Sequence, residues 1–272
     1  CLHPFLQIYR NSIILMKKIK SFTDKNIERF SRQILIEEIG PKGQLDIMNS
    51  SVIIIGCGGL GTAAVTYLSM LGTGKIGIVD NDVVSLSNLN RQSLFSEQDI
   101  GQKKVIVAKK KIISVNSEIE VQISTCRVNK KNIKDLIKNY EIVLDCTDNF
   151  ESRYIINDEC YKERKILIAA ALHSFEVQLF AFKAWSGKNS PCYRCIFPKH
   201  KISSEIGNCN DHGIISPVAG LGGILQANYV VNAILKKNSS MFKQLLIYNC
   251  LNSNQSKINY KKDRNCKICN KT

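Results

Sequence analysis

Short apolar runs alternate with segments of helical periodicity through most of the chain. The run at 52–55 is apolar at every position, which is typical of a strand buried on both faces of a parallel sheet. Strands that alternate with helices of about 10–15 residues predict a Rossmann-like, doubly wound α/β fold with a mostly parallel sheet. The predicted strands are 52–55, 75–80, 118–124, 141–146 and 166–171, and the predicted helices are 62–71, 103–114, 130–139 and 151–163.

The pattern changes at both ends of this region. Residues 22–48 are helical in pattern, with Thr23 or Asp24 as the cap and Gly40-Pro41 as the end of the helix. After residue 172 we expect an antiparallel portion, followed by a tail that binds zinc. Its predicted elements are a strand at 176–184, a loop at 186–211, a helix at 217–237 and late strands at 244–248 and 257–260. We expect 1–21 to be an N-terminal extension outside the fold and 22–272 to form a single domain.

The composition narrows the class of protein. No apolar run approaches the roughly 20 residues of a membrane span, so we expect no membrane partner. The net charge of +15 favours an anionic partner, although a Lys-, Ile- and Asn-rich chain is also what an AT-rich gene encodes. No zinc-finger, homeodomain or RNA-binding pattern accompanies the charge, so we expect no nucleic acid. Eleven cysteines without a convincing signal peptide favour the cytoplasm or an organelle stroma.

A glycine-rich motif follows the first predicted strand. GCGGLG at 56–61 matches G-x-G-x-x-G between a strand and a helix, where backbone amides and the helix N-terminus receive phosphates. Asp80 ends the next strand, where an acidic residue hydrogen-bonds ribose hydroxyls. The motif alone leaves open NAD, ATP or a glycine turn that only packs the helix on the sheet.

Polar residues beyond two strands favour a triphosphate. The segment 80–92, DNDVVSLSNLNRQ, follows a buried strand, and its Arg91, together with Lys104, is placed to reach phosphates. A dinucleotide's two phosphates would hardly need both cations. Asp148 lies just past the strand at 141–146 and is the candidate Mg²⁺ ligand. Asp145, still inside the apolar run, is expected to brace the loop.

Two CxxC pairs predict a metal site. Cys192 and Cys195 form one pair, and Cys266 and Cys269 form the other. Together they supply the four thiolates of a structural zinc site. The alternatives are free thiols or a disulfide in an oxidising compartment.

Taken in order, ERFSRQILIEEIGPKGQ, VIIIGCGGLGT, IVDNDVVSLSNLNRQ, LDCTDN and PCYRC…CKIC resemble the ThiF/MoeB/HesA adenylyltransferases, bacterial relatives of ubiquitin-activating enzymes. The resemblance covers roughly 22–270. It implies an enzyme that uses MgATP to adenylate the C-terminal Gly-Gly carboxylate of a small ubiquitin-like sulfur carrier and releases pyrophosphate. The carrier is expected to serve molybdopterin synthesis, with the thiazole carrier of thiamine synthesis as the alternative.

The resemblance also implies roles for individual residues. Arg91, Lys104 and Asp148 act on the phosphates and Mg²⁺. Arg32 reaches the nucleotide of a partner subunit, which implies a homodimer. The sulfur is expected to come from a separate cysteine desulfurase or rhodanese-type protein. The ATP-binding residues carried over are Gly59, Asp80, Ser87, Asn88, Leu89, Asn90, Arg91, Lys104, Asp148 and Asn149.

Cys209 is a separate question. It lies in the polar segment GNCNDHG, and several members of the resembled family carry a cysteine here that links to the carrier. Nearby His212 could lower the pKa of the thiol. The alternative is a loop cysteine that adenylation does not need.

Two other classes of function remain open at this point. A NAD-dependent oxidoreductase would explain the glycine motif and Asp80, but not the two CxxC pairs together with Arg91, Lys104 and Asp148. A non-catalytic scaffold that keeps the fold would typically have lost Arg91, Lys104 or Asp148.

Overall fold

The computed structural model describes residues 22–198 and 213–270, and the strands within them form one eight-stranded sheet. The strand order is β3-β2-β1-β4-β5-β6-β7-β8. The first five of these strands pair in parallel and the last three extend the sheet antiparallel. This confirms the mostly parallel sheet with an antiparallel C-terminal portion. The strands are β1 (Ser51–Ile55), β2 (Lys75–Val79), β3 (Glu120–Ser124), β4 (Ile142–Asp145), β5 (Ile166–His173), β6 (Glu176–Phe182), β7 (Gln244–Asn249) and β8 (Asn254–Asn259).

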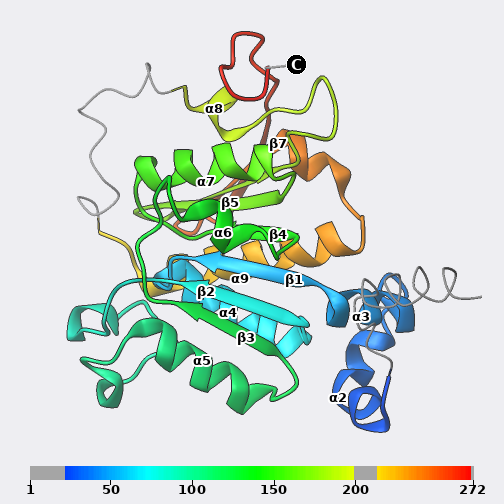
Figure 1. Cartoon of the computed structure of the whole chain (residues 1–272), viewed down its shortest axis with the longest axis vertical. Coiled ribbons are helices and arrows are strands. Elements are labelled where there is room, and N and C mark those ends of the chain that lie inside the picture. Colours follow the sequence, from blue (N-terminus) through cyan, green and yellow to red (C-terminus); the bar gives the residue numbers. More distant parts are fainter. Residues whose placement is uncertain (1–21, 199–212, 271–272) are drawn as a thin grey trace, which may run out of the picture.

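Helices cover both faces of the sheet (Figure 1). Alternate residues of β1 point into two different cores: Val52 and Ile54 into the larger one, Ile53 and Ile55 into the other. Helices α4, α5 and α9 pack in the first core, and α6 and α7 in the second. The helices are α2 (Asp24–Ile34), α3 (Gly40–Asn49), α4 (Gly59–Leu71), α5 (Lys104–Val115), α6 (Ile133–Ile137), α7 (Phe150–Lys162), α8 (Tyr193–Ile196) and α9 (Ser216–Ile234), with short 3₁₀ turns η1 (Leu86–Asn88), η2 (Glu97–Asp99) and η5 (Ser239–Lys243).

The N-terminal helical region, 22–48, consists of two helices: the helix expected to end at Gly40-Pro41 already ends at Ile34, and a second helix follows. Thr23 caps α2 as expected, and its hydroxyl accepts from the Asn26 amide at 3.2 Å. Gly40-Pro41 begins α3 rather than ending a helix. Proline fits the first turn of a helix because its missing N–H would have no partner there.

The helix expected at 130–139 is shorter than predicted. The Asn129 and Asn132 side chains bond backbone groups within 127–132, which holds this stretch in a turn. Helix α6 therefore begins only at Ile133. In contrast, α8 is a single turn inside the segment predicted as a loop.

The carboxyl ends of β1, β2, β3 and β4 meet at the same edge of the parallel half. This is where ligands bind in open α/β sheets, beside the point at which the strand order reverses between β1 and β4. The turn from β1 to α4 lies at this edge, as does the start of α7 (Figure 1).

Candidate nucleotide site and cysteine cluster

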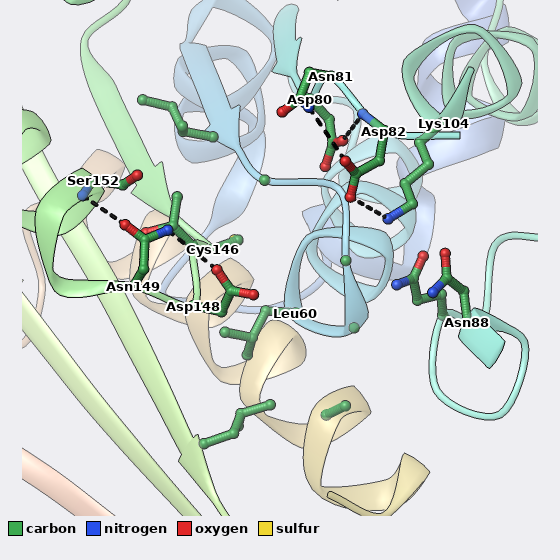
Figure 2. A pocket seen from close by; sticks show the side chains of 18 of the residues that line it. Leu60, Asp80, Asn81, Asp82, Asn88, Lys104, Cys146, Asp148, Asn149 and Ser152 are labelled. Carbon is green, nitrogen blue, oxygen red and sulfur yellow. Dashed lines mark hydrogen bonds and ion pairs between the residues drawn. The ribbon is translucent and has the colours of Figure 1, made fainter. Parts of the chain in front are cut away.

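A pocket of about 800 Å³ opens at the carboxyl ends of the parallel strands. The glycine turn after β1 forms its floor, and polar side chains stand on either side. Figure 2 shows Asp148 and Asn149 on one side of this turn and Asp82 and Lys104 on the other. Its lining includes eight of the ten residues expected to bind nucleotide: Gly59, Asp80, Asn88, Asn90, Arg91, Lys104, Asp148 and Asn149.

The glycine turn requires its glycines. Gly56 has φ of +98°, and a Cβ there would lie 2.7 Å from the Cys146 carbonyl oxygen. A Cβ on Gly61 would collide with the Gly56 carbonyl oxygen. The turn thus brings backbone close to the pocket. No side chain caps the first turn of α4, whose N-terminus faces this space and suits an anion.

Asp80 organises this turn from the end of β2. One of its carboxylate oxygens accepts from the Cys57 amide at 2.7 Å, and the other accepts from the Asp82 amide at 2.8 Å. Each oxygen keeps a further lone pair for a ligand hydroxyl. Burial, followed by the nearby Asp80 charge, raises the pKa of the Cys57 thiol well above its usual range. Cys57 is therefore a packed thiol and not a nucleophile at neutral pH.

Lys104 brings a buried positive charge to the pocket. Its side chain is 5% exposed, and its Nζ lies 3.1 Å from the Asp82 carboxylate, which is 59% exposed. The Lys104 amide also bonds the Asp82 carbonyl at 3.1 Å, so the two residues hold each other. A buried ammonium needs such a partner, and phosphate oxygens can take the same place.

The polar segment after β2 contributes the other cation. Arg91 Nη1 donates to the Ser87 carbonyl at 3.0 Å and to Asn90 Oδ1 at 2.9 Å, which holds the guanidinium at the rim. Ser87 and Leu89, both expected to bind nucleotide, are not among the residues that line the pocket. Leu89 instead packs against the larger core, and the Ser87 hydroxyl lies 3.0 Å from that of Ser85.

The loop after β4 is built on Asp145. One of its oxygens accepts from the Thr147 amide at 2.9 Å and from the Thr147 hydroxyl at 2.6 Å, so Asp145 braces the loop as expected. Burial raises the pKa of this carboxyl, and the Arg153 charge and the Thr147 bonds oppose the rise. Asn149 caps α7 by accepting from the Ser152 amide at 2.9 Å. Asp148, exposed beside it, accepts from the side-chain nitrogen Nδ2 of Asn149 at 3.2 Å and faces the pocket.

Several residues that line the pocket were missed by the sequence reasoning. Cys126, Arg127 and Val128 follow β3, and their position beyond a strand's carboxyl end was the available signal. Arg153 carries no such signal, because it lies inside a helix. Leu172 comes from the end of β5, Gly213 and Ile214 precede α9, and Ala219 lies in the first turn of α9. No sequence motif marks their position at the pocket.

Two expected site residues cannot be placed in this pocket. Arg32 lies exposed in the last turn of α2 and does not line the pocket of its own chain. Cys209 lies outside the described residues.

The two CxxC pairs come together at the far end of α7. Cys192 Sγ lies 3.9 Å from Cys195 Sγ and 3.6 Å from Cys266 Sγ, and Cys195 Sγ lies 3.4 Å from Cys269 Sγ. All four sulfurs lie within 4.8 Å of one another, and we call this set the four-cysteine cluster. Tetrahedral zinc with bonds of about 2.3 Å needs sulfurs about 3.8 Å apart. The donor set therefore fits zinc in both number and spacing.

Hydrogen bonding within the cluster favours thiolates at two positions. Bonding from the Cys192 thiol lowers the pKa of Cys195 to about 7 and also lowers that of Cys266. Thiolates are the form that binds zinc. The cluster packs in a small core of its own with Ala184, Tyr161 and Ile268, so it ties the C-terminal segment to α8.

A family model supplies the identification: the ThiF family model matches residues 30–269. The chain belongs to the ThiF family. It is 38% identical over 245 residues to the adenylyltransferase and sulfurtransferase MOCS3 of Danio rerio, covering 90% of this chain and 53% of that protein. It is 31% identical over 250 residues to the sulfur carrier protein adenylyltransferase of Thermus thermophilus, covering 91% and 92%. The chain thus spans about half the length of the MOCS3 relative.

Solved structures share the fold. E. coli MccB in complex with succinimide matches with a TM-score of 0.76 at 26% identity, covering 89% of this chain and 74% of MccB. E. coli MccB with ATP matches with a TM-score of 0.74 at 25% identity, covering 97% and 80%. Among the described residues, no helix is both long and apolar enough to cross a membrane.

Proposed function

We propose that this ThiF family protein is an adenylyltransferase that activates the C-terminal carboxylate of a sulfur carrier protein with ATP. One observation carries the proposal: Lys104, Arg91 and Asp148 converge on one pocket over the glycine turn. The names of the MOCS3 and Thermus thermophilus relatives support this activity, and the MccB complex with ATP supports the nucleotide.

The charges of the pocket favour a triphosphate over a dinucleotide. Lys104 and Arg91 both line the pocket. The Asp148 carboxylate lies across the glycine turn from Lys104 (Figure 2). Two cations and one metal-binding carboxylate match the charge of the three phosphates and Mg²⁺ of MgATP. The two phosphates of a dinucleotide such as NAD are bound mainly by the N–H groups at a helix N-terminus.

The proposed reaction brings together two anions, the carrier carboxylate and ATP, and therefore requires positive charge that offsets their repulsion. A carrier carboxylate oxygen attacks the α-phosphorus, a new O–P bond forms, and the bond between the α-phosphorus and the bridging oxygen breaks. The electron pair leaves with pyrophosphate. Lys104 and Arg91 offset the charge that develops on the phosphates, and the α4 N-terminus adds its partial positive charge. Asp148 would hold Mg²⁺, which supplies further charge neutralisation.

Asp80 and the glycine turn position the nucleotide. Asp80 holds the Cys57 amide and keeps lone pairs for ribose hydroxyls, and Gly59 lines the pocket at the start of α4. In-line positioning of this kind supplies much of the rate of a displacement that involves no covalent enzyme intermediate. Adenylation as proposed needs no nucleophile from the protein.

We further propose that the carrier ends in Gly-Gly and serves molybdopterin synthesis, with the thiazole carrier as the second candidate. The sulfur donor would be a cysteine desulfurase or rhodanese-type activity. A homodimer would let Arg32 reach the partner's nucleotide, which fits its exposed position away from its own pocket. Zinc in the four-cysteine cluster would be structural, because four thiolates leave no open coordination position.

The experiment that tests the proposal is ATP–pyrophosphate exchange. Purified protein is assayed with Mg²⁺ and, in parallel, with a molybdopterin-type and a thiazole-type carrier, each with a free Gly-Gly end. Exchange that depends on one carrier supports the activity and identifies the carrier. The matched control is the same carrier without its last glycine. Exchange with neither carrier would contradict the proposal.

A further inference from the structure

Gln92 lines the nucleotide pocket next to Arg91 but is not among the residues expected to bind nucleotide. The residue is 3% exposed. Its side-chain Oε1 is buried without a hydrogen-bond partner, and no described residue accepts a hydrogen bond from its Nε2. Buried amides are almost always hydrogen-bonded. An amide that lacks partners at the wall of a pocket therefore requires a bound group to supply one.

The amide nitrogen of Gln92 faces the start of α4. A Cβ built on Gly58, the N-cap of α4, would come within 4 Å of one described atom beyond its chain neighbours, Gln92 Nε2 at 3.9 Å. The space in front of Gly58 is therefore open, and Nε2 borders it. A Cβ on Gly59 would instead lie 3.4 Å from the Arg91 carbonyl oxygen. Residues 91–92 thus lie against the first turn of α4.

Backbone hydrogen bonds fix Gln92 in this position. Its backbone N–H donates to the Asn88 carbonyl at 3.0 Å, and its carbonyl accepts from the Phe95 amide at 3.2 Å. Phe95 is buried in the larger core, and Leu89 packs against that core. The backbone of Gln92 is thus held between two core anchors, while its side chain keeps its hydrogen-bonding groups for a ligand.

The proposed place of the ribose decides which phosphate lies nearest. Asp80 accepts from the Cys57 amide at 2.7 Å and is the proposed partner of the ribose hydroxyls. Gly58 and Gly59 follow Cys57 directly, at the N-terminus of α4, which favours an anion. The α-phosphate is the one attached to the ribose, so it is the phosphate expected beside these two glycines. Gln92 Nε2 is a hydrogen-bond donor at that place.

We propose that Gln92 binds the α-phosphate of ATP, with Nε2 donating a hydrogen bond to a non-bridging oxygen. The inference rests on the proposed adenylation, in which the carrier carboxylate attacks the α-phosphorus. Negative charge grows on the non-bridging oxygens as the new O–P bond forms, and a donor that is already in place stabilises this charge. Because an amide carries no charge, it cannot trap the attacking carboxylate in an ion pair, as a further lysine or arginine would.

Nucleotides with successive phosphates test this contact. Adenosine, AMP, ADP and a non-hydrolysable ATP analogue are titrated by calorimetry, with Mg²⁺, into wild type and into Gln92→Met. Methionine keeps the length of the side chain and removes both hydrogen-bonding groups. We expect adenosine to bind both proteins equally. AMP, ADP and the analogue should each bind the variant about tenfold more weakly, the loss expected for one hydrogen bond to a charged group.

The reaction gives a second readout. At saturating ATP, Gln92→Met should slow ATP–pyrophosphate exchange by at least about tenfold, because the donor is also missing when charge develops on the α-phosphate. Gln92→Glu keeps the shape of the side chain but replaces the donor with an anion. It should bind AMP more weakly still than Gln92→Met does, and adenosine as wild type does.

The matched control is Gln44→Met. Gln44 is a fully buried glutamine at 0% exposure, and its Oε1 likewise has no partner. Its Nε2 donates to the Leu71 carbonyl at 3.0 Å, at the end of α4. At 1.5 Å per residue, this is about 18 Å along the helix from Gly59. Because the two positions are independent, Gln44→Met should keep each nucleotide affinity within about twofold of wild type.

The outcomes separate this contact from the proposed function. Unchanged AMP affinity in Gln92→Met overturns the inference, and so does an equal loss for adenosine, which would mean that Gln92 only shapes the pocket. Wild type that binds none of the nucleotides overturns the inference and the proposed function together. Wild type that binds them but catalyses no exchange with either carrier contradicts the proposed function alone, since these affinities need no carrier. Fluorescence of Trp185, the single tryptophan, checks folding; if Gln92→Met is unfolded, Gln92→Glu decides.

Discussion

Lys104 is held in place by Asp82, and this pairing sets what substitution there should do. The ammonium is almost fully buried while the carboxylate is largely open to water. In the proposed reaction, a phosphate that enters the pocket would meet an ammonium already oriented by Asp82, and little reorganisation would be needed when charge develops on the leaving group.

We expect Lys104→Met to lower the rate of ATP–pyrophosphate exchange by roughly 100-fold or more, because a preorganised charge at the transition state is lost. Methionine keeps most of the buried stem, so the fold should survive. Lys111→Met, on the exposed face of the same helix, is the control and should retain the rate. Exchange unaffected at Lys104 would remove it from the phosphate site.

If Asp148 binds Mg²⁺, its substitution should change how the rate of exchange depends on Mg²⁺ concentration. Asp148→Ala should abolish exchange at ordinary Mg²⁺ concentration, because the remaining ligands bind the ion too weakly. A titration of exchange against Mg²⁺ makes the measurement. Asp135→Ala removes another exposed carboxylate, which pairs with Lys138 and does not line the pocket, and this variant should titrate like wild type. Normal exchange by the Asp148 variant would refute the assignment.

The sequence predicted single residues where a motif or a strand end marked them. The pocket is lined by four residues predicted in this way: Asp80, Arg91, Lys104 and Asp148. Arg153 was not predicted, because a buried arginine inside a helix looks like any amphipathic helix residue until the carbonyls it binds, those of Thr147 and Ala170, are known.

Among the elements, the turn between β1 and α4 leaves little room for added side chains beside the pocket. A Gly61→Ala substitution would push its methyl group against the Gly56 carbonyl, so the helix must shift away from the strand. We expect nucleotide affinity to fall by at least tenfold, since a 1.4 kcal/mol change already does this and core overpacking costs about 1–3 kcal/mol.

Calorimetry with a non-hydrolysable ATP analogue and Mg²⁺ measures this loss of affinity. Gly187→Ala is the matched control, because its added Cβ meets only the Ser190 hydroxyl at 3.7 Å. Unchanged affinity in the Gly61 variant would mean that the turn has room that the structure does not show.

Element order was predictable from the chain, and element boundaries were not always. Apolar runs such as 52–55 are typical of buried strands, so the order of strands and helices along the chain could be predicted. The break between α2 and α3 was misread, because glycine and proline punctuate the start of a helix as readily as its end. The packing of the start of α9 beside the pocket depends on contacts between segments that are distant in sequence, and local patterns cannot predict such contacts.

The whole molecule carries a net charge of +15, and this should govern association with an acidic carrier. We expect the KM for the carrier to rise with added salt, because screening weakens long-range attraction. The KM for ATP, measured in the same salt series, separates an effect on the carrier from one on the nucleotide. A carrier KM that is independent of ionic strength would rule out electrostatic steering.

The parallel and antiparallel halves of the sheet support different sites. The parallel half supplies the strand ends that carry the nucleotide pocket, whereas the antiparallel half supports α9 and leads to the C-terminal cysteines. Helix α7 belongs to the parallel half in sequence yet reaches the cysteines, so one helix contacts both sites.

The four-cysteine cluster brings together residues 74 positions apart, Cys192 and Cys266. With an ion bound, the chain between them becomes a closed ring. The turn between β7 and β8 is an exposed stretch of that ring, with Leu251 72% exposed. A protease that cuts there would open the ring without freeing either piece. Nicked protein should run as one species on a native gel and separate only after a chelator and denaturant are added together.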